Sequence, residues 1–238
     1  FSQGRADFRS VNNELLTRTE VVVSPEDDIE MRRYHITNNS SVRRSIDVTS
    51  YAEVVLASAA SDLIQPAFSN LFVQTEILHD KNAIICTRRP RSVGEHPPWM
   101  FHLMTVQGKE PVGVSFETDR MEFIGRGNSV RNPRALQSFN PLSGSQGSVL
   151  DPIVSIRYYI NLDPGETVTI DMLSGIADTK EHCLGLVNKY KDKHHKDRIF
   201  ELAWTHSQVI LRQINATEAD AQLYARLASP ILFTNSAF

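Results

Sequence analysis

Short segments in which apolar and polar residues alternate, separated by turn residues, are the feature that most constrains this fold. The clearest case is residues 153–160, where four residues share one apolar face: Val154, Ile156, Tyr158 and Ile160. Residues 163–166 follow with proline second and glycine third, as a type II turn requires. Residues 167–173 then resume the alternation. We expect these two segments to form a hairpin.

Roughly ten segments of this kind, with turn signals between them, predict a large antiparallel sandwich. Residues 46–56 have one apolar face to cover a core and one polar face. Residues 29–37 form the preceding expected strand, and residues 38–41 after it, Asn-Asn-Ser-Ser, have the composition of a hairpin turn. Residues 101–106 and 112–116 form the next expected pair. The pattern in residues 1–18 is too weak to assign.

The apolar period becomes helical at Thr179, a residue that can cap a helix. A later helix is expected to begin at Thr217, where Asp220 completes a pattern that resembles a capping box. Pro230 should end or kink that helix. The sequence therefore predicts a β domain over residues 1–178 and a helical segment over residues 179–238.

Bulk properties narrow the function classes. The chain has 238 residues and a formal net charge of −3, which argues against a nucleic-acid surface because such surfaces carry a basic excess. Its apolar runs are too short for a membrane helix. The chain begins at Phe1 without a signal-peptide pattern, so we expect a piece of a longer protein. Cys86 and Cys183 are expected to be buried free thiols.

The most functional-looking stretch is residues 117–133, ETDRMEFIGRGNSVRNP, which we expect to be a long polar loop that contacts a partner. Gly125 and Gly127 would let the backbone approach another surface closely. The arginines are the candidate binding residues, because a guanidinium suits anionic or hydroxyl-rich partners: Arg120, Arg126 and Arg131. Alternatively, they only pair with acids of the same stretch.

Catalytic patterns are weaker. A glycosidase needs paired carboxylates at a defined separation, and the candidates are Glu117, Asp119, Glu122 and Asp151. Salt-bridged or solvated carboxylates are the simpler interpretation. The acids at residues 26–28 and the pair His194–His195 lack the spacing of metal ligands. We assign no catalytic residue, metal or cofactor.

Several stretches, taken in order, resemble one family. They are VVVSPEDDIEMRRYHITNNS, RRSIDVTSYAEVVLASAASDLIQPAFSNLFVQTE, RRPR, FETDRMEFIGRG, NPRAL and GSVLDPIVSIRYYINLDPGE. Together they are similar to the amino-terminal β-sandwich of glycoside hydrolase family 94, formerly glycosyltransferase family 36. The cyclic β-1,2-glucan synthases are the most similar members. The resemblance covers about residues 6–175 and continues into the helices.

The resemblance implies a galactose-mutarotase-like β-supersandwich and then a helical linker that leads to an (α/α)6 catalytic barrel outside this chain. The general-acid aspartate and the phosphate site of the family belong to that barrel. The implied function is a non-catalytic module of a β-glucan-active enzyme, one not active alone. It would support the barrel and lend Arg120, Arg126 and Arg131 to the sugar or phosphate site.

The implied partners are a β-glucan or oligosaccharide, the remainder of the parent polypeptide and a second copy in a homodimer. The implied location is the cytoplasmic side of a bacterial inner-membrane protein. Two alternatives stay open. A free-standing carbohydrate-binding module would need an exposed aromatic platform, for which Trp99 and Trp204 are the candidates. A purely structural scaffold or dimerisation domain would bind no sugar.

Overall fold

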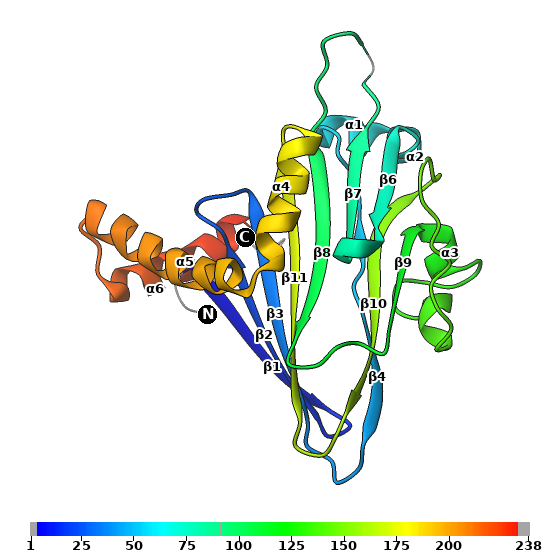
Figure 1. Cartoon of the computed structure of the whole chain (residues 1–238). Helices are drawn as coiled ribbons and strands as arrows, with labels where there is room; N and C mark the ends of the chain where they lie inside the picture. Colours follow the sequence, from blue (N-terminus) through cyan, green and yellow to red (C-terminus); the bar gives the residue numbers. More distant parts are fainter. Residues whose placement is uncertain (1–3, 91, 233–238) are drawn as a thin grey trace.

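The computed structural model describes residues 4–90 and 92–232, and within them the strands form a seven-stranded and a four-stranded sheet. The two sheets pack face to face (Figure 1). The first, here called the large sheet, has the order β1-β2-β3-β11-β8-β7-β6. The second, the small sheet, is built on β10, which pairs with β4, β5 and β9. Neighbouring strands are antiparallel throughout, so the expected antiparallel sandwich is confirmed.

The large sheet contains β1 (Arg5–Asn12), β2 (Leu15–Val23), β3 (Ile29–Asn38), β6 (Val73–Leu78), β7 (Ala83–Arg88), β8 (Trp99–Gln107) and β11 (Thr167–Ala177). The small sheet contains β4 (Arg44–Thr49), β5 (Ala52–Glu53), β9 (Gly113–Asp119) and β10 (Pro152–Leu162). Short helices α1 (Ala59–Ile64) and α2 (Pro66–Asn70) lead into β6, and α3 (Arg120–Ile124) follows β9. The connections include the 3-10 turns η1 (His79–Lys81) and η2 (Arg134–Gln137).

The core between the sheets is formed by the inward faces that the alternation predicts. Both sheets contribute buried residues to this layer: Ile36, Ile84, Met104, Val154, Ile156, Tyr158, Ile160, Val168 and Ile170. Because side chains alternate across a strand, the opposite face of each strand points away from this layer. The predicted apolar face of residues 46–56 packs on the same core.

The expected hairpin of residues 153–173 is wrong. β10 lies in the small sheet and β11 in the large sheet, so the turn between them is an arch that joins the sheets. The turn itself forms as expected: Glu166 N–H donates to Asp163 O at 3.0 Å, and Gly165 has φ +75°. A type II turn does not match the twist of a hairpin, which agrees with its use as an arch.

Two other expected pairings are also wrong. Residues 38–41 carry the chain from β3 in the large sheet to β4 in the small sheet, and do not close a hairpin. Likewise β8 and β9, expected as partners, belong to different sheets. In each case consecutive strands face each other across the core. Moreover, β1, which the sequence left unassigned, is an edge strand of the large sheet.

Asn38, the last residue of β3, holds two of these connections together. The connections that follow β3 and β10 both lie at the lower end of the sandwich in Figure 1. Asn38 is fully buried, and its backbone N–H donates to Glu166 O at 2.9 Å, while Gly165 N–H donates to its carbonyl at 2.7 Å. The amide Nδ2 donates to Val42 O at 2.8 Å and to Leu162 O at 3.1 Å. One side chain therefore contacts both arches.

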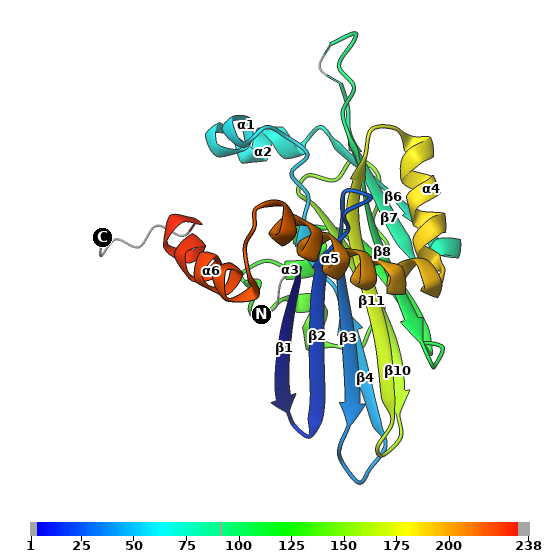
Figure 2. The same cartoon turned by 90° about the vertical axis from the view of Figure 1, so that its left-hand side faces the viewer.

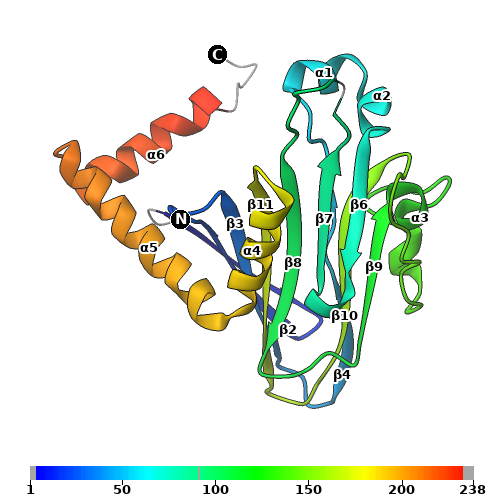
Figure 3. The same cartoon turned by 45° about the horizontal axis from the view of Figure 1, so that its top comes forward.

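Helices α4 (Lys180–Lys191), α5 (Lys193–Gln213) and α6 (Glu218–Leu232) follow the sandwich. Figures 1 and 2 show α4 along the outer face of the large sheet and α5 crossing its end. The α4 residues Cys183, Leu186, Val187 and Tyr190 complete a second core on that face. Figure 3 shows α6 standing away from the sheets.

The two predicted helix caps form, whereas Pro230 does not end its helix. Thr179 caps α4 by accepting from His182 N, and Thr217 and Asp220 exchange the hydrogen bonds of a capping box. Pro230 lies inside α6, which continues to Leu232 and is not ended by it. Cys86 and Cys183 are buried free thiols. Within the described ranges no helix has the length and hydropathy to cross a bilayer.

Candidate functional site

The stretch predicted as a loop at residues 117–133 begins as regular structure. β9 runs to Asp119, and α3 follows at once. Asp119 caps α3, because its Oδ1 accepts from Met121 N at 2.8 Å. Phe123 and Ile124 are buried against Ile153 of β10, which fixes the helix on the small sheet. The irregular loop therefore starts only at residue 125, and it is supported by a rigid strand and helix.

Arg120 is anchored at the start of α3. Its Nε lies 3.0 Å from Glu53 Oε1, and its Nη1 lies 3.4 Å from Asp151 Oδ2. Desolvation acts against its charge, but hydrogen bonds with Tyr51 and Glu53 outweigh it and raise the pKa of Arg120. This arginine joins α3 to β5 and to the segment before β10, and a part of its side chain stays exposed.

Arg126 and Arg131 are placed differently. Both are exposed on the loop that follows α3. Arg131 lies within a tight turn in which Asn132 N–H donates to Ser129 O at 3.0 Å, and Arg126 precedes that turn. Neither takes part in an ion pair among the residues that the structure describes. Glu122 pairs instead with Arg134, at 2.6 Å. The alternative that these two arginines neutralise the acids of their own stretch therefore does not hold.

The glycines serve the loop itself. Gly125 has φ +80°, and a Cβ added there would lie 2.8 Å from Arg134 Cβ. The close approach that the sequence suggested is thus made within the chain. Gly127 has φ +78°, and a Cβ there would meet open space. Both positions favour glycine by backbone conformation.

The candidate carboxylates all have structural partners. Glu117 is buried and accepts from the backbone of Thr118 and Asp119 at 3.0 Å and from Ser143 Oγ at 2.5 Å. Asp151 accepts from Asn70 Nδ2 at 3.0 Å and pairs with Arg120. Glu122 and Asp151 are thus in ion pairs, whereas Glu117 and Asp119 are held by hydrogen bonds from neighbouring groups.

Sequence reasoning missed the residue that organises the far side of the loop. Arg157 of β10 is completely buried, and its guanidinium donates to Ala135 O at 2.6 Å, to Asn140 O at 3.0 Å and to Thr49 Oγ1 at 2.9 Å. Tyr159, two residues on, donates to Phe139 O at 2.7 Å. The available signal was an arginine and a tyrosine on the polar face of a strongly alternating strand.

A pocket of about 300 Å³ lies beside residues 125–133, here called the arginine loop. Its polar lining comes from β9, α3 and the segment that follows this loop: Glu117, Glu122, Arg134, Ser138, Asn140 and Ser143. Pro141 and Leu142 form its apolar wall. Hydroxyl, amide, carboxylate and guanidinium groups together suit a ligand with hydroxyl groups.

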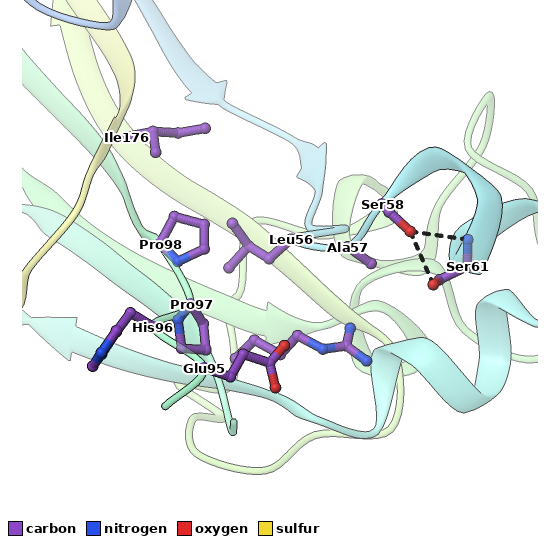
Figure 4. Close-up of a pocket in the computed structure, with 10 residues that line it drawn as sticks. Leu56, Ala57, Ser58, Ser61, Glu95, His96, Pro97, Pro98 and Ile176 are labelled. Carbon is purple, nitrogen blue, oxygen red and sulfur yellow. Dashed lines mark hydrogen bonds between the residues drawn. The ribbon is translucent and has the colours of Figure 1, made fainter. Parts of the chain in front are cut away.

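A hollow of about 530 Å³ lies at the end of the sandwich near α1 (Figure 4). Leu56, Pro98 and Ile176 give it an apolar lining. Ser58 and Ser61 line another side of the hollow, with their Oγ atoms 2.9 Å apart, and Ser58 caps the start of α1. None of the predicted arginines lines this hollow in the described part of the chain.

Comparison with known proteins gives a family model and two relatives. Residues 1–193 match the model described as glycosyl hydrolase 94, supersandwich domain. The cyclic beta-(1,2)-glucan synthase NdvB of Rhizobium meliloti (strain 1021) is 31% identical over 233 residues, which is 98% of this chain and 8% of that protein. Solabiose phosphorylase of Paenibacillus borealis is 27% identical over 169 residues, 71% of this chain and 21% of that protein.

Among solved structures, a polysaccharide lyase matches 76% of this chain and 23% of its own, with 14% identity and a TM-score of 0.43. That likeness is too distant to support an argument. The family model covers most of the chain, and the relatives agree with it. The resemblance drawn from the sequence is therefore confirmed, and the chain belongs to the supersandwich-domain family of glycosyl hydrolase 94.

Proposed function

We propose that this chain is the non-catalytic β-sandwich module of a β-glucan-active enzyme of the cyclic β-1,2-glucan synthase or phosphorylase kind. One observation carries the proposal. Almost the whole chain aligns with a glucan synthase, yet it spans only 8% of that protein. Such a small share of the relative's length is expected if the chain is one module among several in a larger enzyme. A non-catalytic role also agrees with the state of the candidate carboxylates, which are engaged in structural hydrogen bonds and ion pairs: Glu117, Asp119, Glu122 and Asp151.

In this proposal residues 1–178 form the supersandwich, and residues 179–238 form a helical linker to an (α/α)6 catalytic barrel. The exposed apolar side chains of α6 support a linker that contacts a further domain. Leu223 is 51% exposed, Leu227 54% and Ile231 77%, and water-exposed apolar surface of this kind marks interaction sites. The partner that covers these side chains is the barrel of the parent polypeptide or a second copy of this chain. The intact protein lies at the cytoplasmic side of a bacterial inner membrane.

Arg126 and Arg131 are the residues proposed to reach the sugar or phosphate site of the barrel. Their exposure supports this role, as does the rigid support beneath them. Arg120 instead serves to position α3, because its guanidinium is engaged with Glu53 and Asp151. This division revises the sequence-based set, in which the three arginines were equivalent.

The first test is activity of the chain alone. Incubated with β-1,2-linked glucooligosaccharides and inorganic phosphate, it is expected to release no glucose 1-phosphate above a heat-treated control. The reason is that the acid needed for phosphorolysis is proposed to belong to the barrel. Turnover that survives purification and disappears on heating contradicts the proposal.

A further inference from the structure

A second candidate site lies on the outer face of the large sheet, around Trp99. Cross-strand pairing places Gln74, Thr87 and Trp99 side by side on β6, β7 and β8. The next row on that face, Glu76, Ile85 and Phe101, follows the same pairing. Because these residues occupy paired positions on regular strands, their relative placement is fixed by the sheet.

Two hollows of about 370 Å³ each meet along this row, and both are lined by Gln74, Thr87 and Trp99. We call the joined surface the Trp99 groove. One hollow continues to the start of α4, at Thr179, Lys180 and Glu181. The other continues to Gln146 and Gly147 at the edge of the sheet. The groove therefore crosses the part of the large sheet beside the start of α4.

Both ends of the groove are held in place. Gly147 pairs with Thr75 through backbone hydrogen bonds of 2.9 and 3.0 Å, and Gln146 Oε1 accepts from Ile77 N at 2.8 Å. At the other end Lys180 Nζ lies 2.6 Å from Glu76 Oε2 and 5.4 Å from the centre of the Trp99 ring. Trp99 is half-buried against the outer core. An aromatic ring thus stands among fixed amide, hydroxyl, ammonium and carboxylate groups.

We propose that the Trp99 groove binds a neutral oligosaccharide, such as a segment of glucan. The apolar face of a sugar ring packs on an indole, and its hydroxyl groups both donate and accept hydrogen bonds. Gln74 supplies a donor and an acceptor, and it makes no side-chain hydrogen bond among the described residues. The lining carries charges of both signs in nearly equal number: Arg88, Arg89, Lys180, Glu76, Glu95, Asp178 and Glu181. Such a balance favours a neutral ligand over an anion.

This site is separate from the arginine loop, which lies by α3 and the small sheet. The chain has two tryptophans, Trp99 and Trp204, and Trp204 is 63% exposed on α5. The variant Trp204→Phe therefore leaves Trp99 as the only indole reporter. In that variant, titration with β-1,2-linked glucooligosaccharides is expected to change the Trp99 fluorescence and to saturate. Glucose 1-phosphate at the same concentration is expected to leave it unchanged.

Affinity is then measured by calorimetry in further variants. Trp99→Ala is expected to weaken binding about tenfold or more, through loss of the stacking surface. Gln74→Ala, at an exposed position that leaves the fold intact, is expected to weaken it about threefold or more. Trp204→Phe alone should bind as the parent chain does. Binding that is unchanged in both Trp99→Ala and Gln74→Ala overturns the proposal, as does the absence of any saturable binding.

Arg126→Ala separates this inference from the proposed function. Oligosaccharide binding to the Trp99 groove should be unchanged in that variant, because Arg126 lies outside the groove lining. Loss of binding in Arg126→Ala, with retention in Gln74→Ala, would place the saccharide at the arginine loop and overturn the groove. If the proposed contact between this chain and a catalytic barrel proves wrong, the groove measurements still stand, because they use this chain alone.

Discussion

At the scale of single residues, Arg157 shows how a buried charge can serve a surface loop. Its guanidinium donates to the carbonyl groups of Ala135 in η2 and of Asn140 in the irregular segment that follows. A fully buried arginine is retained only when its donors are paired, since an unpaired charge in the interior is costly. Arg157 therefore determines where the wall of the pocket beside the arginine loop lies.

Arg157→Leu is expected to lower the free energy of unfolding by roughly 3 kcal/mol, because it removes several charge-assisted hydrogen bonds that a buried guanidinium makes. Urea denaturation followed by circular dichroism measures the change. Arg131→Leu is the matched control, since Arg131 is exposed and its loss should stay within about 0.5 kcal/mol. Equal stabilities for the two variants would contradict the role given to Arg157.

His102 is a second buried polar residue with a measurable consequence. It lies on β8 and is hydrogen-bonded to Ser174 Oγ and Ser50 Oγ, both at 2.9 Å. Burial, with a smaller contribution from Arg32, lowers the pKa of His102 to about 4 from the ordinary 6.5. The folded protein therefore holds this ring neutral where the unfolded chain would protonate it.

The sign of the pH effect follows from that difference. Between pH 6.5 and 4 the unfolded state binds more protons at this residue, so stability falls as the pH falls. The loss approaches about 3 kcal/mol near pH 4, and above pH 6.5 the residue makes no pH-dependent contribution. His102→Gln is expected to flatten this part of the stability profile, measured by urea denaturation at several pH values. His194→Gln, on the exposed start of α5, should leave the profile unchanged.

At the scale of elements, the sequence predicted strands and their faces but not their partners. Residues 154–160 and 168–172 have apolar faces that meet in the core between the sheets. A hairpin places such faces side by side, and an arch places them opposite each other, so the alternation is the same in both. The discriminating signal was the turn: Gly165 at φ +75° in the third position suits a type II turn, which hairpins disfavour.

Helical elements were easier to predict than the arginine stretch. The caps at Thr179 and Thr217 depend on local hydrogen bonds, which a sequence encodes directly. Helix α3 has five residues, too few for a periodic pattern, and its stability depends on Phe123 and Ile124 packing against distant Ile153. The anchoring of Arg120 similarly depends on Glu53 and Asp151, remote in sequence. Tertiary contacts of this kind were beyond sequence reasoning.

The two arches yield an element-scale prediction through Asn38. Asn38→Ala removes amide hydrogen bonds to both connections while it keeps the backbone bonds. We expect a loss of about 2–3 kcal/mol in the free energy of unfolding, because the buried Leu162 carbonyl and the Val42 carbonyl lose their donor. Thermal and urea denaturation measure it. Asn39→Ala, at the exposed neighbouring position, is the control and should differ from the parent by less than about 0.5 kcal/mol.

At the scale of the whole molecule, the sandwich separates its possible contacts onto different faces. The Trp99 groove crosses the outer face of the large sheet. The arginine loop follows α3 beside the small sheet, and α6 stands away from the two sheets (Figures 1 and 3). A module with several contacts around one rigid core can orient a neighbouring domain and hold a polymer at the same time. This arrangement agrees with a supporting role in a larger glucan-active enzyme.

The proposed role of the arginine loop is tested in the intact parent enzyme. A charge-assisted contact from arginine to a phosphate or a desolvated sugar contributes on the order of 1.5–3 kcal/mol. Arg126→Ala is therefore expected to lower phosphorolysis by roughly one to two orders of magnitude, since about 1.4 kcal/mol corresponds to tenfold. The melting temperature should barely change, because Arg126 is exposed and makes no ion pair in the described structure.

The control for that experiment is Arg134→Ala, because Arg134 pairs with Glu122 at 2.6 Å and packs against Gly125. If the loop acts only through its own integrity, Arg134→Ala should reduce activity at least as much as Arg126→Ala. If Arg126 itself contacts the ligand, its loss should reduce turnover more than the loss of Arg134 does. The affinity for substrate then reports on binding, and the melting temperature reports on stability. Specific activity that is unchanged in Arg126→Ala would remove this arginine from the site and leave the sandwich with a purely supporting role.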